Sequence, residues 1–201
     1  MPIVVDIANA ALNACGSDDV LVTLDDANKS GRLCKQNYDF ARRAVLAKHP
    51  WKFANKRVVI DLDTSDTPAF GWTSRYLLPE DYIRAICVND RYEEWEREGR
   101  YILCNESTAI NLKYTSDEQD VAIFDPLFLD AVAYDLALRI VYPLTQSNDR
   151  VETIGKMYTT AIRKARFSDS FDKSMSQIQA DLYDDARIVG GVSSWPPNAQ
   201  V

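Results

Sequence analysis

Apolar residues near the N-terminus recur at steps of three and four positions, as they do along one face of an α-helix. The positions are Val4, Ile7, Ala8, Ala11, Leu12 and Cys15, with polar residues between them. This pattern predicts an amphipathic helix over residues 3–15, and Gly16 favours its end because glycine commonly follows a helix. A second helix is predicted to begin around Asp25 to Ser30 and to be limited by Pro50, because the residue before a proline is driven away from helical angles. Its apolar stripe is Cys34, Tyr38, Ala41 and Val45.

The middle of the chain changes to short, β-branched and partly alternating segments, which predict β-strands. Four strands are expected, at residues 57–62, 82–88, 100–104 and 109–114. Segment 63–73 contains Pro68 and Gly71, and segment 92–99 ends in a Glu98-Gly99 turn, so both have the composition of loops. We expect both loops to project from the β part.

Asp125-Pro126 is typical of a helix start, because proline is well tolerated in the first helical turn. The residues that follow leave little polar face, which predicts a helix at the buried centre of the fold, closed by Pro143. Asp135 and Arg139 lie one turn apart on it and are placed to form an ion pair. A fourth helix, capped by Ser147 or Asn148, is expected to carry the apolar residues Val151, Ile154, Met157, Tyr158, Ala161, Ile162 and Ala165.

Together these elements predict an α+β fold with a four-helix core, formed by two N-terminal and two C-terminal helices. A small, mainly antiparallel β part is expected to be inserted in the middle. Beyond Phe167 the chain is rich in Ser, Asp and Gln, a composition that seldom folds alone and predicts an extended C-terminal arm. The expected organisation is a single domain at 1–167, helical over 1–50 and 125–167 and β-rich over 51–124, followed by the arm at 168–201.

Composition narrows the class of protein. The 201 residues are 46% hydrophobic, enough for a real core, and the net charge of -7 argues against a surface that reads DNA sequence or binds an anionic membrane. The four cysteines form no C-x-x-C pair, and the first twenty residues lack the pattern of a signal peptide, so reduced, mainly buried thiols in a cytoplasmically assembled protein are expected. No apolar stretch approaches the roughly 20 residues needed to span a bilayer.

Candidate chemistry is sparse. His49 is the only histidine, which excludes His-based metal clusters, and we interpret it as a helix-end residue that satisfies a carbonyl. We interpret Trp51 and Phe53 as a hydrophobic plug and not as a platform on which nucleic-acid bases stack. We interpret Glu80-Asp81 as part of the first turn of a helix and not as a pair of acids that cleaves glycans. No catalytic, cofactor-binding or metal-binding residue is assigned, and no cofactor is expected.

Several short sequence segments, which we call strings, occur along the chain in a characteristic order and spacing. They are HPWKFA at 49–54 followed by Lys56-Arg57, YLLPEDYIR at 76–84, FDPLF at 124–128, DLALRI at 135–140 and YPLT at 142–145. In order and spacing they resemble the tail tubular protein A family, the head-to-tail connector or adaptor proteins of short-tailed bacteriophages. The resemblance runs from about Ile7 to Phe167 and is loosest over residues 89–108.

The resemblance implies a structural subunit of the virion neck, assembled in the host cytoplasm, and not an enzyme. Copies would form a homo-oligomeric, dodecameric ring between the portal protein and the tail nozzle or tube protein of the tail tubular protein B type. DNA would pass through the lumen during packaging and ejection, and acidic walls would repel it instead of holding it. Two alternatives stay open: a glycan hydrolase of the virion, and another neck protein such as a head-completion or stopper protein.

Two groups of residues are candidate contacts within such an assembly. The portal or a neighbouring subunit is expected to meet Arg163, Lys164, Arg166, Trp195, Pro196 and Pro197. For the three cations, a simple complement to the helix dipole is the competing interpretation. The tail-side candidates come from the two predicted loops and are Asp63, Asp66, Phe70, Trp72, Glu94, Trp95 and Glu96. For the acidic run, a charged edge that discourages unwanted strand pairing is the competing interpretation.

Overall fold

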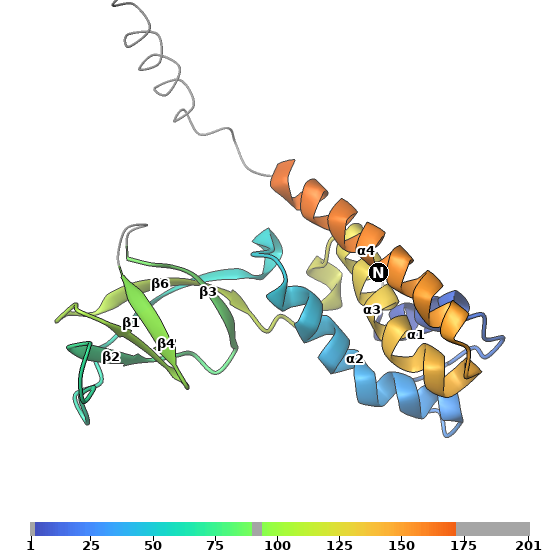
Figure 1. Cartoon of the computed structure of the whole chain (residues 1–201), viewed down its shortest axis with the longest axis horizontal. Helices are drawn as coiled ribbons and strands as arrows, with labels where there is room; N and C mark the ends of the chain where they lie inside the picture. Colours follow the sequence, from blue (N-terminus) through green and yellow to red (C-terminus); the bar gives the residue numbers. More distant parts are fainter. Residues whose placement is uncertain (1–2, 90–93, 172–201) are drawn as a thin grey trace, which may run out of the picture. The chain divides into compact units, whose positions relative to one another are not determined.

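The computed structural model describes residues 3–89 and 94–171. Within these residues the chain forms two helices, then a group of strands, then two more helices (Figure 1). The helices are α1 (Val4–Cys15), α2 (Lys29–Ala47), α3 (Pro126–Thr145) and α4 (Asn148–Phe171). The described residues up to Ser170 belong to one compact unit.

Local sequence explains where the helices begin and end. Gly16 follows α1 with a φ of 69°, a left-handed conformation that glycine adopts without a Cβ clash. The Asn28 side chain caps α2 by accepting a hydrogen bond from the Gly31 N–H. Asp125 caps α3 in the same way through the Leu127 N–H, and Pro126 then occupies the first turn.

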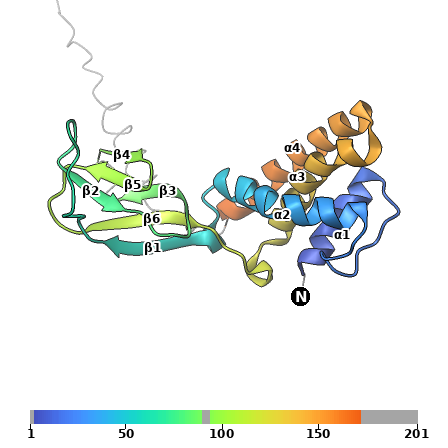
Figure 2. The same ribbon diagram turned by 90° about the horizontal axis from the view of Figure 1, so that it is seen from below.

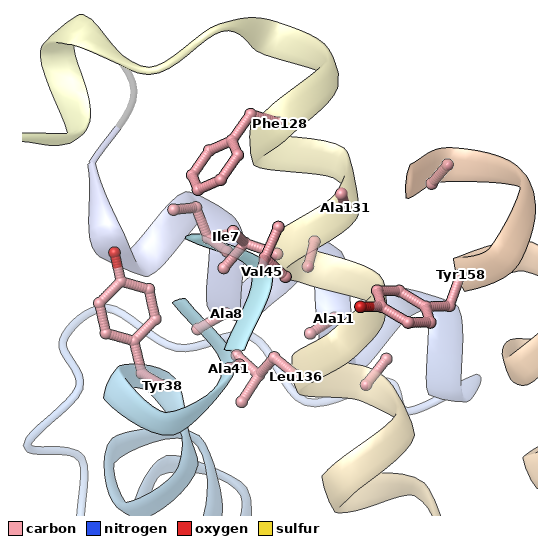
Figure 3. Close-up of a cluster of buried hydrophobic side chains, with 14 of the residues drawn as sticks. Ile7, Ala8, Ala11, Tyr38, Ala41, Val45, Phe128, Ala131, Leu136 and Tyr158 are labelled. Atoms are coloured by element: carbon pink, nitrogen blue, oxygen red, sulfur yellow. The ribbon is translucent and has the colours of Figure 1, made fainter. Parts of the chain in front are cut away.

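Helix α3 lies at the centre of a buried helical core. It packs against both α1 and α2, and apolar residues of α4 complete the cluster. Figure 3 shows part of this core, with labelled side chains that include Ala8, Ala11, Ala41, Leu136 and Tyr158. Alanines at these contacts let helix backbones approach closely, while Leu136 supplies apolar area worth roughly 25 cal/mol per Å² buried. The prediction that this helix forms the buried centre is confirmed.

The β part consists of two antiparallel sheets of three strands each within the described residues (Figure 2). The first has the order β1 (Asn55–Ile60), β6 (Ile110–Ser116) and β3 (Tyr82–Val88). The second has the order β2 (Ser74–Leu77), β5 (Tyr101–Cys104) and β4 (Trp95–Glu98). Alternate residues of both sheets meet in one cluster, the β core, which comprises Ile60, Tyr76, Leu78, Val88, Ile102, Cys104, Ile110, Leu112 and Tyr114.

The predicted fold class is wrong in its β part. Instead of one small group of four strands, the chain forms two sheets with separate hydrogen-bonded ladders and a hydrophobic core of their own. The strands β2 and β4 were not predicted, because Ser74–Leu77 and Trp95–Glu98 are short and mostly polar or charged. Each of them pairs with β5 and with no other named strand, although Tyr76 of β2 also forms an isolated bridge with Leu62, and charged residues are common in such edge strands.

The C-terminal part also differs from the prediction. Pro143 does not close α3, which continues to Thr145, because a proline in the last turn disturbs few further backbone hydrogen bonds. Helix α4 runs to Phe171, so the first residues of the predicted arm are helical. The rest of that arm, residues 172–201, lies outside the described residues.

Glu80-Asp81 does not begin a helix. These residues form a turn between β2 and β3, in which the Tyr82 N–H donates to the Pro79 carbonyl at 3.2 Å. Because β3 starts directly at Tyr82, the chain has no room for the helical turn that the sequence favoured.

Candidate functional site

The two sheets of the β part present two outer surfaces, because their inner sides share the β core. On the sheet β1-β6-β3 the outer residues Arg57, Val59, Cys87, Asn111 and Lys113 line a shallow depression of about 480 Å³. We call these five residues the basic face. On the sheet β2-β5-β4 and its adjoining loop, the outer residues Phe70, Trp72, Leu77, Glu96 and Glu98 form what we call the acidic face.

Arg75 organises the loop that carries much of the acidic face. Its Nε donates to Asp63 Oδ2 at 2.9 Å, and its Nη1 donates to Asp66 Oδ2 at 2.6 Å. Hydrogen bonds from Ser65, together with the Arg75 charge, lower the pKa of Asp63. The same guanidinium lies 4.6 Å from the centre of the Tyr101 ring, a cation–π contact. The loop is therefore tied to the sheet at both of its carboxylates.

The tied loop displays aromatic residues. Phe70 is 89% exposed at its tip, next to Gly71, whose φ is 81°. Trp72 Nε1 donates to Glu96 Oε2 at 3.2 Å, so this loop meets the second predicted tail-side segment. The prediction that this second segment is a projecting loop is wrong, because Trp95–Glu98 forms strand β4 of the sheet. An exposed large aromatic beside charged residues is typical of a docking surface.

The structure brings most of the predicted tail-side residues together but places Trp95 on the inner side of the sheet. Asp63, Asp66, Phe70, Trp72 and Glu96 gather on the loop and the edge of one sheet. Trp95, in contrast, packs against the β core, because it alternates with Glu96 along β4 and faces inward. Glu94 is exposed, just before β4.

Sequence reasoning missed Arg75 and Leu77. Leu77 is half-exposed on the acidic face, and Arg75 holds the loop beneath it. Both belong to β2, whose four residues, Ser74–Leu77, are too few and too mixed in polarity to give a signal that could have located them.

The basic face contains an unfavourable pairing. Arg57 of β1 lies directly opposite Lys113 of β6, and Lys113 lies opposite Cys87 of β3. Like charges directly opposite each other destabilise a sheet. Within residues 3–89 and 94–171, no hydrogen bond or ion pair engages either cationic side chain. Val59, next to them, is 62% exposed.

The predicted basic cluster on α4 is divided by the structure. Arg166 Nη2 donates to the Lys48 carbonyl at 2.6 Å, which ties α4 to the end of α2. Lys164 lines a groove of about 370 Å³ between α3 and α4, together with Met157 and Asp130. Arg163 is exposed. Trp195, Pro196 and Pro197 lie outside the described residues.

The single histidine has a structural partner that the sequence did not indicate. His49 Nε2 lies 3.0 Å from Asp169 Oδ2, and the Lys52 backbone N–H donates to Asp169 Oδ1 at 2.9 Å. The interpretation of His49 as a residue that satisfies a carbonyl is therefore wrong, since it meets a carboxylate. Asp169 thereby fixes the end of α4 to the segment between α2 and β1.

Asp81, one of the two acids considered for glycan cleavage, is held in an ion pair. Its Oδ2 accepts a hydrogen bond from Lys56 Nζ at 2.8 Å, and its Oδ1 accepts one from the Tyr114 hydroxyl at 2.8 Å. Partial burial acts to raise the pKa of Asp81, but the two hydrogen bonds and the Lys56 charge lower it overall. A general acid for glycoside cleavage needs a raised pKa, so this environment favours an anchor.

The cysteines are all free and differ in accessibility: Cys15, Cys34 and Cys104 are buried, and Cys87 is partly exposed. Burial raises the pKa of Cys15 and of Cys34 to about 11. Because the thiolate is the reactive form, we expect Cys87 to react first with a thiol reagent such as DTNB in the native protein. Mass spectrometry after partial labelling checks the order, with Cys87→Ser as the control. Faster labelling of Cys15 or Cys34 would contradict the structure.

The same two thiols predict an alkaline loss of stability. In the unfolded chain they ionise near the ordinary pKa of about 9, whereas in the folded chain they keep their protons until about pH 11. Between these two pH values the folded state binds more protons than the unfolded chain. The stabilisation that the two thiols contribute is therefore fully present below pH 9, and the free energy of unfolding falls as the pH rises to 11. Urea denaturation across this window measures the slope. The double variant Cys15→Ala, Cys34→Ala should show a smaller slope.

Comparisons with known proteins, and the search of the described residues for metal sites and membrane-spanning helices, give no further candidate site. No family model matches the sequence, and a search of curated proteins found no match either. Among the described residues, no three His, Cys, Asp or Glu side chains are grouped so that they could hold a metal ion. No helix in the described part of the chain is both long and apolar enough to cross a bilayer.

Proposed function

We propose that this chain is a structural adaptor of the neck of a tailed bacteriophage. Copies form a ring, dodecameric as in the family it resembles, between the portal protein and the tail nozzle, and DNA passes through the lumen. The observation that carries the proposal is that three of the strings resembling the adaptor family meet at the join between the helical core and the β part.

The first of these contacts between strings is formed by aromatic side chains. Trp51 and Phe53, from the string at 49–54, pack against Phe124 and Phe128, from the string at 124–128. The ring centres of Trp51 and Phe128 lie 5.0 Å apart, and those of Phe53 and Phe124 lie 5.3 Å apart. Edge-to-face and tilted contacts at such distances stabilise beyond the burial of area. The prediction of a hydrophobic plug at Trp51 and Phe53 is confirmed.

Polar contacts bring in the string at 76–84. Its Asp81 forms the ion pair with Lys56, and Arg84 Nη1 donates to the Ala47 carbonyl at the end of α2 at 3.3 Å. In the fourth string, Arg139 Nε donates to Asp135 Oδ2 at 2.7 Å, so the predicted i,i+4 pair is confirmed. Of these polar contacts, the Arg84–Ala47 hydrogen bond joins the β part to α2, and with the aromatic cluster it supports the resemblance, because residues at such a join are those a structural family would share.

Reconstitution tests the proposal. The purified chain, mixed with the portal protein encoded by the same phage, should give a ring stacked on the portal in electron micrographs. The tail nozzle protein should bind the portal only after the ring has formed. If the subunits stay free and do not bind the portal even at high concentration, the proposed adaptor role is contradicted.

A glycan-release assay tests the enzymatic alternative. Incubation with peptidoglycan or capsule polysaccharide should release no more reducing sugar than a heat-denatured sample releases. The matched variant Asp81→Asn removes a carboxylate while keeping the shape of the side chain. Activity of the native chain that this variant abolishes would count against the adaptor proposal.

A further inference from the structure

We infer that the basic face of one copy receives the acidic face of the next copy, so that the two outer surfaces of the β part form the contact between neighbouring subunits. This inference rests on the proposed ring. It names the surfaces that meet in the ring, which neither the resemblance nor the fold specifies.

The first argument is the uncompensated charge of the basic face. Arg57 and Lys113 face each other across β1 and β6, and both lack a hydrogen-bonded or ion-paired partner within residues 3–89 and 94–171. This pairing costs stability in an isolated subunit. The chain has a net charge of -7, yet none of the ion pairs of the described residues includes Arg57 or Lys113. A carboxylate supplied by another molecule would remove the repulsion.

The second argument is the complementary charge of the acidic face. Glu96 and Glu98 occupy alternate positions of the edge strand β4, so both point to the outer side of the sheet. The carboxylates Asp63, Asp66, Glu96 and Glu98 stand against the three guanidinium groups of Arg75, Arg97 and Arg100, which leaves one net negative charge. The basic face carries two positive charges, from Arg57 and Lys113, so the two faces have net charges of opposite sign.

The third argument is that both faces also expose apolar surface. Val59 stands beside Arg57 on the basic face, while Phe70 and Leu77 stand out from the acidic face. Stable protein contacts place apolar and aromatic side chains at the centre and charged groups around them. The depression of about 480 Å³ on the basic face is open enough to receive a side chain such as Phe70.

Geometry then selects the type of assembly. The two sheets are joined through their inner sides, so their outer surfaces point away from each other (Figure 2). A contact between two different surfaces is heterologous, and it generates a closed ring when the rotation between copies closes. A symmetric dimer would instead need one self-complementary surface, which neither face provides, because each carries charge of one predominant sign.

Charge reversal on each face tests the inference. One variant carries Arg57→Glu and Lys113→Glu, and the other carries Glu96→Lys and Glu98→Lys. Sedimentation of each protein is measured at high concentration and an ionic strength of about 0.01 M, where charges interact over about 30 Å. We expect the native chain to associate beyond the dimer and each variant alone to associate at least tenfold more weakly. An equal mixture of the two variants should regain association, because acidic surfaces then meet basic ones.

Matched controls separate this contact from effects of net charge or folding. The double variant Arg32→Glu, Lys35→Glu changes the net charge as the first variant does, but on the exposed side of α2, and should associate like the native chain. The milder variant Lys113→Gln should melt at a higher temperature than the native chain, since it removes the cross-strand repulsion, yet should associate less. A monomeric native chain, loss of association in the α2 control, or a mixture that stays dissociated would overturn the inference.

The outcomes also separate this contact from the adaptor role. If the variant mixture associates but the native chain never binds portal, the contact stands and the adaptor role fails. If portal-bound rings form equally well from either variant alone, the adaptor role stands and the contact proposed here fails.

Discussion

Replacing Trp51 by alanine should lower the free energy of unfolding by about 3–5 kcal/mol, the range for a large aromatic removed from a packed core. Trp51 is 1% exposed and contacts both Phe53 and Phe128. Its Nε1 also donates to the Val45 carbonyl at 3.0 Å, so alanine removes that hydrogen bond as well as leaving a cavity, while the Val45 carbonyl keeps the hydrogen bond from the Lys48 N–H. Urea denaturation followed by far-UV circular dichroism measures the change.

Two control variants divide this loss into its parts. Trp51→Phe keeps much of the aromatic packing but removes the hydrogen bond, so it should cost clearly less than alanine. Phe40→Ala removes an aromatic from the exposed side of α2 and should change stability by no more than about 0.5 kcal/mol. Equal losses in Trp51→Ala and Phe40→Ala would mean that the aromatic cluster does not hold the fold together.

Replacing Asp117 by alanine should cost about 3–5 kcal/mol, because it leaves a buried arginine with only the distant, exposed carboxylate of Asp39 as a countercharge. The Arg42 side chain is only 2% exposed, and its Nη1 donates to Asp117 Oδ1 at 2.7 Å and to the Glu118 carbonyl. Asp117 directly follows β6 and Arg42 lies on α2, so the pair joins the β part to the helices. Chemical denaturation of the variant measures the loss.

The same arginine provides an internal control. Asp39 also approaches Arg42, at 3.4 Å, but its side chain is 75% exposed, so Asp39→Ala should cost well under about 1 kcal/mol. The double variant Arg42→Met, Asp117→Ala removes both charges and should be more stable than Asp117→Ala alone. If the double variant is the less stable one, the cost does not come from an unpaired buried charge.

The helices were predictable because their apolar residues repeat at a spacing that only a helix brings to one side. Ala8, Ala11 and Leu12 illustrate this, since all three are fully buried in the helical core. The strands β2 and β4 were not predictable in the same way, because strands of four residues with charged members give no clear alternation. Their positions depend on pairing with β5, a tertiary contact that local sequence does not encode.

The candidate surfaces were likewise predictable from the sequence only in part. Polar and aromatic composition identified the loop around Phe70 and the acidic run around Glu96 as surface segments, and the Trp72–Glu96 hydrogen bond joins them. The repulsive pair Arg57–Lys113 could not be found from sequence, because it depends on the register between β1 and β6. Likewise, nothing in the sequence near His49 indicates Asp169, which lies 120 positions away.

The pairing of Asn55 with Thr115 in β1 and β6 means that the β part begins and ends at one place. Directly paired residues of antiparallel strands have Cα atoms about 5 Å apart, a gap that a turn of two or three residues can close. The β part is thus an insertion with adjoining ends and a hydrophobic core of its own. Such a segment is open to wholesale exchange by recombination, so related chains could acquire different β parts while the helices stay the same.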